Sequence, residues 1–210
     1  MEAEVFRSVI ALLAVGSPIR CKEASMIFFK KGARTALGLV EEKYIPLFLK
    51  LLNDQDRTAP NLRRTFPITE EDERGWIKKA YSGPYPTNLP FLIVALDLPT
   101  PEVIGTVGFG EIDYINRTAT TGTMIVEEAR GKGYGTEAKH LLLAYAFNAL
   151  NLRAVKSHVY AFNKASLRVQ EKCGYKEVAR LPGWCERGNE FFDEVILIVT
   201  YEEWLEHQSN

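Results

Sequence analysis

The sequence predicts an α/β (α+β) domain in which helices cover a β-sheet. Runs rich in branched and aromatic residues, typical of strands, fill much of the chain. Runs with apolar residues at helical spacing lie between them, which favours a sheet packed against helices. The chain has 210 residues, of which 46% are hydrophobic and 25% charged, enough for one packed domain with extensions.

The first third of the chain predicts two strands and two helices. Residues 1 to about 25 could form a short amphipathic helix or a frayed extension. "SMIFFKKGARTALGLV" predicts two short strands joined at Lys31-Gly32, and "EEKYIPLFLKLLND" predicts a helix. The polar, proline-containing "NDQDRTAPNLRRTFP" predicts a loop, after which Thr69 begins a helix with an acidic first turn.

The rest of the chain predicts most of the sheet. "PFLIVALD", "VIGTVGFGEIDYI" and "NRTATTGTMIV" are strand-like, and "TEAKHLLLAYAFNAL" carries an apolar helical stripe. "AVKSHVYAF" predicts a further strand. Asn163 and Gly174 are typical of the start and end of a helix. Residues 176–204 predict a hairpin of two strands that turns near Gly188.

Charge and cysteine content narrow the class of protein. The formal net charge is −1 and the pI about 6.3, so no bulk basicity points to nucleic acid. Cys21, Cys173 and Cys185 are odd in number and widely spaced, which favours neither a disulfide framework nor a metal site. The longest early uncharged run, "SVIALLAVGSPI", is shorter than the roughly 20 residues of a membrane span. We therefore expect a soluble, cytoplasmic protein without a metal, a membrane or a nucleic acid as partner.

The stretch "EARGKGYGTEA", residues 128–138, predicts an anion site. Three glycines alternate with other residues between a predicted strand and a predicted helix, and Arg130 and Lys132 add positive charge. Free N–H groups at a helix N-terminus bind anions, and glycine lets the backbone approach them closely. The loop would suit a phosphate or a pyrophosphate. A glycine-rich turn with two solvated cations is the alternative.

Two familiar phosphate loops do not fit this stretch. The P-loop needs G-x-x-x-x-G-K-[ST], but Lys132 is followed by Gly133. The dinucleotide fingerprint needs G-x-G-x-x-G with an acidic residue about 20 positions later, and "NLRAVKSHV" has none. The glycine spacing therefore disfavours a nucleotide-dependent oxidoreductase.

The pattern R-x-x-G-x-G at Arg130, Gly133 and Gly135 resembles the acyl-CoA loop of the GNAT superfamily of N-acetyltransferases. "N-x-x-S" at Asn163 and the later "K-C-G-Y" follow in the order of that family, and the resemblance covers roughly residues 27–205. It is closest to the branch that acetylates ribosomal-protein N-termini (Rim-type). The resemblance implies a mixed, mostly antiparallel sheet of about seven strands with splayed middle strands, flanked by about four helices. Residues 1–26 would then be an extension and 206–210 a tail.

The resemblance also implies that acetyl-CoA is the co-substrate. Its pyrophosphate would lie on the glycine loop, and backbone groups of Ile125 and Val126 would meet the pantetheine arm and the thioester oxygen. Asn163 would serve both as helix cap and as a contact to the arm. Lys172 or Arg168 would reach the outer phosphate, unless both simply lie on a solvated helix face. The residues assigned to acetyl-CoA are Ile125, Val126, Arg130, Gly131, Lys132, Gly133, Tyr134, Gly135, Thr136, Asn163 and Lys172.

The catalytic residues are less well defined by the sequence. Many relatives carry a tyrosine seven residues after the asparagine, but this chain has Gln170 there, which favours Ser166 as the acid toward the leaving thiolate. Glu186 is the candidate base, with Glu111, Asp113 or a water relay as alternatives. The histidines show no triad or ligand spacing, and Cys173 is expected in the core rather than as a nucleophile.

We therefore expect direct transfer of acetyl from acetyl-CoA to a primary amine by a monomer or homodimer. An α-amine of a peptide or small amino compound is favoured over a polyamine, because its pKa is about 7.7–8.0 against about 10.4 for a lysine-type amine. A polyamine or aminoglycoside acetyltransferase is one alternative, and a non-catalytic acyl-CoA-binding regulatory module is another. The sequence leaves open whether the acyl group is acetyl or longer.

Overall fold

The computed structural model describes residues 26–53 and 66–209. The N-terminal segment, expected to be a helix or an extension, and most of the proline-containing loop lie outside these residues. The two strands and two helices expected on either side of that loop are present.

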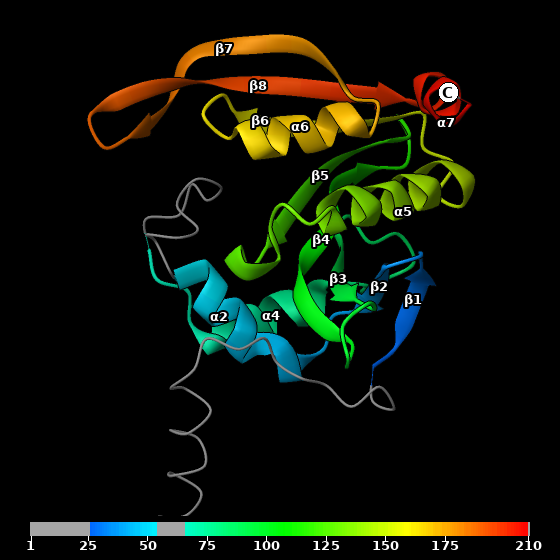
Figure 1. Cartoon of the computed structure of the whole chain (residues 1–210), viewed down its shortest axis with the longest axis vertical. Coiled ribbons are helices and arrows are strands. Elements are labelled where there is room, and N and C mark those ends of the chain that lie inside the picture. The colour runs from blue at the N-terminus through cyan, green and yellow to red at the C-terminus, as the bar shows by residue number, and fades with distance from the viewer. Residues whose placement is uncertain (1–25, 54–65, 210) are drawn as a thin grey trace, which may run out of the picture.

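The described residues form one eight-stranded sheet (Figure 1). The strands are β1 (Phe28–Lys31), β2 (Thr35–Leu39), β3 (Leu89–Ala95), β4 (Glu102–Asp113), β5 (Thr118–Ile125), β6 (Ala154–Tyr160), β7 (Lys176–Arg187) and β8 (Glu190–Thr200). Their order across the sheet is β1-β2-β3-β4-β5-β6-β8-β7, and every neighbouring pair is antiparallel except β5 and β6. The predicted mixed, mostly antiparallel sheet is thus confirmed.

Five α-helices lie in the described residues, together with two short 3₁₀ helices, η2 (Glu42–Tyr44) and η3 (Glu127–Ala129). The α-helices are α2 (Ile45–Asn53), α4 (Glu70–Lys79), α5 (Tyr134–Asn148), α6 (Lys164–Lys172) and α7 (Tyr201–Gln208). Thr69 caps α4, as predicted, by accepting a hydrogen bond from the N–H of Asp72. None of these helices is long and apolar enough to cross a bilayer.

The C-terminal helix α7 corrects the prediction that strand continues to Trp204. Thr200 accepts a hydrogen bond from the N–H of Glu203, and the Glu203 carboxylate accepts one from the N–H of Thr200. This capping box was readable in the sequence as Thr followed by Glu three residues later. The branched residues of β8 directly before it made the strand the stronger local signal.

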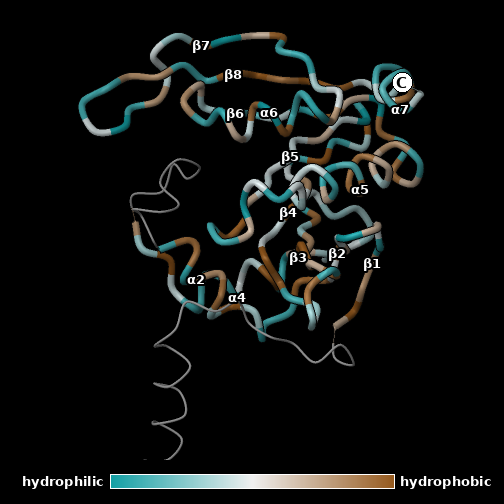
Figure 2. Tube along the Cα trace, in the orientation of Figure 1, coloured by the Kyte–Doolittle hydropathy of each residue, from teal (hydrophilic) through white to brown (hydrophobic). Residues whose placement is uncertain are grey.

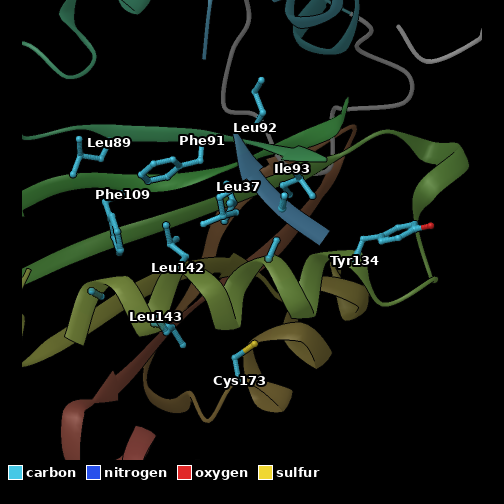
Figure 3. Packing of buried hydrophobic residues seen from close by; sticks show 14 of the residues in the cluster. Leu37, Leu89, Phe91, Leu92, Ile93, Phe109, Tyr134, Leu142, Leu143 and Cys173 are labelled. Carbon is cyan, nitrogen blue, oxygen red and sulfur yellow. The ribbon is translucent and has the colours of Figure 1, made fainter. Parts of the chain in front are cut away.

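The main core lies between the sheet and α5. Figure 3 shows Phe91 and Phe109 of the sheet facing Leu142 of α5, with Cys173 on the other side of the helix. These side chains are at most 3% exposed. Figure 2 shows β8 as largely hydrophobic and much of the outer strand β7 as hydrophilic, in agreement with the burial of the two strands. The core therefore fixes α5, and with it the loop that precedes the helix.

The two middle strands separate along their length. β5 and β6 pair only where Thr118–Thr120 lie beside 154–156. β5 continues to Ile125 and β6 to Tyr160 without pairing with each other, while β4 and β8 remain paired to their outer sides. We call this unpaired stretch the β5–β6 gap. It confirms the expected splay of the middle strands.

Candidate active site

The glycine loop joins the end of β5 to α5 and turns twice through backbone conformations that favour glycine. Gly131 has a φ of 74° and Gly133, the N-cap of α5, a φ of 93°. A Cβ at Gly131 would meet no atom within 4 Å, and one at Gly133 would meet only Arg34, at 3.8 Å. The space before the first turn of α5 is therefore open. Within that turn the N–H of Thr136 donates to the carbonyl of Gly133 at 3.1 Å. The N–H groups of Tyr134 and Gly135, by contrast, have no helical carbonyl to bond.

Two residues from elsewhere in the chain hold the loop in place. The Arg34 guanidinium donates from Nε to the Asp97 carboxylate at 2.7 Å and from Nη1 to the carbonyl of Lys132 at 3.1 Å. The hydroxyl of Tyr134 donates to the other Asp97 oxygen at 2.7 Å, and this bond and Arg34 lower the pKa of Asp97. Sequence reasoning missed Arg34 and Asp97 because nothing local in either stretch links them to the loop.

Tyr134, one of the residues assigned to acetyl-CoA, is the first residue of α5. Its side chain is only 4% exposed and lies at the first turn of α5, as Figure 3 shows. The Arg34 guanidinium carbon lies 5.0 Å from the centre of its ring. The Tyr134 side chain thus supports the loop, and only its backbone lies at the open N-terminus of the helix.

At the end of β5, Ile125 and Val126 differ in what they can offer a ligand. The N–H of Val126 donates to the carbonyl of Ile104 at 2.9 Å, and its carbonyl accepts from the N–H of Ala129. Both backbone groups of Val126 thus have partners within the chain, and its contact with the pantetheine arm stays a prediction. Because antiparallel hydrogen bonding alternates, the backbone groups of Ile125 point away from β4, toward the β5–β6 gap. The carbonyl of Ile125 accepts a bond from Arg130 Nε at 3.0 Å.

A buried polar cluster lies where β5 and β6 begin to separate. Lys139 Nζ donates to Thr121 Oγ1 at 3.0 Å, and the hydroxyl of Tyr175 lies 3.1 Å from the same oxygen. Lys139 is 0% exposed, and burial lowers its pKa to about 8. Burial also raises the pKa of Tyr175 and raises that of Cys173 to about 12. Cys173 is therefore a protonated core thiol, as expected, and a poor nucleophile.

This arrangement of glycine loop, separated strands and capped helix matches a known family. The Acetyltransferase (GNAT) domain model matches residues 34–176. The chain belongs to the GNAT acetyltransferases. The resemblance stated from the sequence is thus confirmed, and the protein is an N-acetyltransferase that uses acetyl-CoA.

Several GNAT proteins are similar to this one. The putative phosphinothricin acetyltransferase YwnH of Bacillus subtilis (strain 168) is 30% identical over 165 residues, which is 77% of this chain and 96% of YwnH. Spermidine N-acetyltransferase from Vibrio cholerae, in complex with CoA and spermine, has a TM-score of 0.73 at 21% identity over 83% of this chain and 99% of that chain. RimJ of Mycobacterium smegmatis, in complex with CoA-disulfide, has a TM-score of 0.70 at 21% identity over 80% and 83%. At such identities the two structures show the shared fold.

Two unpartnered polar atoms in this GNAT protein suit a ligand with amide groups. Thr123 Oγ1, on the unpaired part of β5, and Gln170 Oε1, on α6, are buried and have no hydrogen-bond partner within the described residues. Gln170 is only 3% exposed. Leaving a buried polar atom unpaired costs about 1–3 kcal/mol, which a bound ligand can offset. Thr123, on a strand that borders the gap, therefore fits a contact with the pantetheine arm of acetyl-CoA.

The start of α6 lies at the end of β6. The N–H of Asn163 donates to the carbonyl of Tyr160 at 2.8 Å, and Asn163 Oδ1 accepts from the N–H of Ser166 at 3.0 Å. The predicted helix cap is confirmed, and it places Ser166 in the first turn of α6, beside the end of the gap. At the other end of α6, Cys173 Sγ lies 3.7 Å from the carbonyl of Thr136 in the first turn of α5. The neighbouring Lys172 is exposed, and its carbonyl lies 2.8 Å from Nε2 of His207 in α7.

The three carboxylates considered as the general base, Glu186, Asp113 and Glu111, lie on different parts of the sheet. Glu186 is exposed on β7 opposite Phe191, next to the hairpin turn and beyond the part of β8 that pairs with β6. Its neighbour Arg187 lies 5.1 Å from the ring of Phe162, which directly precedes the start of α6, so the role of Glu186 as base stays a prediction. Asp113 accepts hydrogen bonds from the N–H groups of its own turn, chiefly that of Asn116, which lower its pKa. Glu111 accepts a bond from Thr120 Oγ1 at 2.7 Å, at the root of the gap. No group of three or more metal-ligating side chains lies in the described ranges.

Proposed function

We propose that this protein transfers the acetyl group of acetyl-CoA directly to the α-amine of a peptide or of a small amino compound. The observation that carries the proposal is that the glycine loop and the open N-terminus of α5 directly follow β5, the strand that borders the β5–β6 gap. Bound acetyl-CoA supplies an activated thioester, and the chain binds it, orients it and handles the protons.

Each part of this arrangement has a role in the proposal. The N–H groups of the loop and of the start of α5, from Gly131 to Gly135, hold the pyrophosphate next to Thr136, and Lys132 and Lys172 add positive charge to the phosphates. Arg130, which reaches back to the carbonyl of Ile125, brings its charge to the mouth of the gap. Asn163 contacts the pantetheine arm at the start of α6.

The chemical step uses two further groups. The N–H of Ile125, which points toward the gap, donates to the thioester oxygen as negative charge develops there, a contribution of about 3 kcal/mol in comparable acyl transfers. Ser166 donates a proton or a hydrogen bond to the departing thiolate. Glu186 was the base expected from the sequence, but its exposed position near the hairpin turn weakens its case.

The choice of an α-amine rests on proton chemistry. With a pKa of about 7.7–8.0, a sizeable fraction of an α-amine is neutral at about pH 7.5, whereas a polyamine nitrogen is almost entirely protonated. A polyamine is the second candidate, because a similar structure is that of a spermidine N-acetyltransferase bound to CoA and spermine.

A substitution at Gly133 tests the cofactor site. A valine there would strain the left-handed backbone and place a side chain where the anion lies, so Gly133→Val should abolish acetyl-CoA binding in a calorimetric titration. Gly188→Val is the matched control, since Gly188 has a φ of 64° with no atom within 4 Å of its Cβ position and lies in the hairpin turn. Normal affinity in Gly133→Val would contradict the assignment of the loop.

A further inference from the structure

Side chains of β5, β6 and β8 share the face of the sheet that is opposite α5. Thr121 faces α5, because its hydroxyl bonds Lys139 of that helix, so its neighbours Thr120 and Gly122 face the other way. Lys156 pairs with Thr120 and therefore lies on this second face, as does His158 two residues later. Glu194 of β8 pairs with Tyr160 and lies there too.

The position of His158 on this face is next to the gap. It lies two residues beyond Lys156, the last residue of β6 that pairs with β5, so it belongs to the part of β6 that no longer pairs with β5. If the register of the pair Thr120–Lys156 is extended by two residues, Gly122 of β5 lies across the gap from His158. Gly122 is exposed. A Cβ at Gly122 would meet no atom within 4 Å, so there is open space on this face.

His158 is held by a buried carboxylate. Its Nδ1 lies 3.3 Å from Oε1 of Glu194, whose side chain is 6% exposed, whereas that of His158 is 36% exposed. A proton on Nδ1 directed at a carboxylate leaves Nε2 as the unprotonated nitrogen. The pair therefore presents a proton acceptor at the exposed edge of the ring.

We propose that His158, oriented by Glu194, is the general base that removes a proton from the acceptor ammonium during acetyl transfer. This proposal rests on the proposed function and names the base for the same site. His158 is the catalytic residue, and Glu194 is a positioning residue that acts through the imidazole. His158 replaces Glu186 in this role because it lies on a strand that borders the gap, whereas Glu186 lies next to the hairpin turn.

The protons and bonds balance in this scheme. His158 Nε2 takes one proton from the ammonium, and the freed amine nitrogen forms a bond to the acetyl carbonyl carbon. The carbon–sulfur bond then breaks, the nitrogen loses its second proton, and the thiolate takes up one proton from Ser166 or from solvent. The products are an N-acetyl amide and CoA thiol, with one net proton released through His158.

Other charged groups on this face also act on the pair. Lys156 is the cation on the same strand, and Glu111 of β4 adds a carboxylate bonded to Thr120. Tyr160 contributes a phenol on the same strand, and Glu194 belongs to β8. The two carboxylates favour the approach of a cationic acceptor to this face, and Lys156 disfavours an acceptor with several positive charges.

The test is a pH profile of kcat/KM for a short peptide. General bases contribute about 10²–10⁴-fold, so His158→Gln should lower kcat/KM about a hundredfold at pH 7.5 with an unchanged Kd for acetyl-CoA. Because the base takes the proton of the bound ammonium, the wild-type profile should fall on the acid side with one ionisation, the protonation of the base. In His158→Gln the reaction needs an amine that is already neutral, so the acid limb should follow the ionisation of the peptide amine instead.

Three further variants separate the possible outcomes. Glu194→Gln should lower kcat/KM and shift the acid limb, and Glu194→Asp should restore part of the loss, which loss of packing alone would not produce. His140→Gln, in the histidine on α5 that stacks on His207, is the matched control and should keep full activity. If His158→Gln keeps the rate and the pH profile of the wild type, or if Glu186→Gln changes that profile and His158→Gln does not, the base assignment is wrong while the proposed function stands. If the wild type acetylates neither the peptide nor any other amine tested, both the proposed function and the assignment of His158 as base are wrong.

Discussion

At the scale of single residues, the site depends on groups whose roles were readable only in part. The sequence pattern identified Gly131 and Gly133 correctly as loop glycines. Both have a positive φ, a backbone conformation that favours glycine, so the residue type itself indicates the turn. Asn163 was readable for the same reason, as a polar residue directly before a helix. The hydrogen bonds of the Val126 backbone were not readable, since they depend on the neighbouring strand, where the carbonyl of Ile104 accepts from its N–H.

Ser166 offers a prediction at this scale. Its N–H bonds the Asn163 cap and would remain after substitution, so Ser166→Ala should leave α6 intact. We expect a lower kcat, by about tenfold, with the Kd for acetyl-CoA nearly unchanged, because a donor to the leaving thiolate acts mainly during transfer. A thiol with a pKa of about 8.5 leaves readily even as thiolate, which keeps the expected loss modest. An unchanged kcat in steady-state assays would show that Ser166 has no part in the chemical step.

At the scale of elements, α5 and its loop form one unit that separate parts of the chain hold. The Glu137 carboxylate accepts bonds from the N–H of Arg34 and the hydroxyl of Thr35, which ties the first turn of α5 to the β1–β2 turn. Asp97, which follows β3, joins Arg34 to Tyr134. Helices, strands and caps could be predicted because their signals are local, whereas this network joins segments that only the folded sheet brings together.

The network yields a prediction at the element scale. Asp97→Asn keeps the shape of the side chain but removes the charge that pairs with Arg34, so the loop should lose order before any ligand binds. We expect acetyl-CoA affinity to fall about tenfold, or 1.4 kcal/mol, while kcat at saturation stays within about twofold. Asp113→Asn, in a carboxylate that bonds only its own turn in the described hydrogen bonds, is the control. Equal Kd values for the wild type and Asp97→Asn would mean that the loop does not need this support.

At the scale of the whole molecule, the fold class, the mixed sheet and the splayed strands followed from the sequence and the resemblance it carries. The burial of Lys139 could not be predicted, because a lysine at this position of α5 could lie on either the exposed or the buried face of the helix. The apolar residues around it on α5 form the core stripe, and the helix turns Lys139 inward with them. Its Nζ meets Thr121 at the point where β5 and β6 separate, so a charge is buried at the centre of the domain.

Burial of Lys139 predicts how stability depends on pH. Because the folded pKa of about 8 lies below the ordinary 10.5, the unfolded state binds more protons between these values. The free energy of unfolding should therefore rise with pH in this window, and the cost should be fully present below about pH 8. In urea unfolding, Lys139→Met should be more stable than the wild type by up to about 3 kcal/mol at pH 7.5, and this difference should shrink by about 1 kcal/mol at pH 9. The exposed Lys79→Met should show no such change, and a constant difference for Lys139→Met would contradict the account.

The most direct test of the central claim is the rate of CoA thiol release from acetyl-CoA with a short peptide and with spermidine at one pH. A direct transfer to an α-amine predicts release that depends on the peptide, one acetylated peptide for each CoA, and a higher kcat/KM for the peptide than for spermidine. Absence of amine-dependent release would mean that the protein binds acyl-CoA without turning it over. A tenfold advantage for spermidine, about 1.4 kcal/mol in transition-state stabilisation, would show that the acceptor is a polyamine.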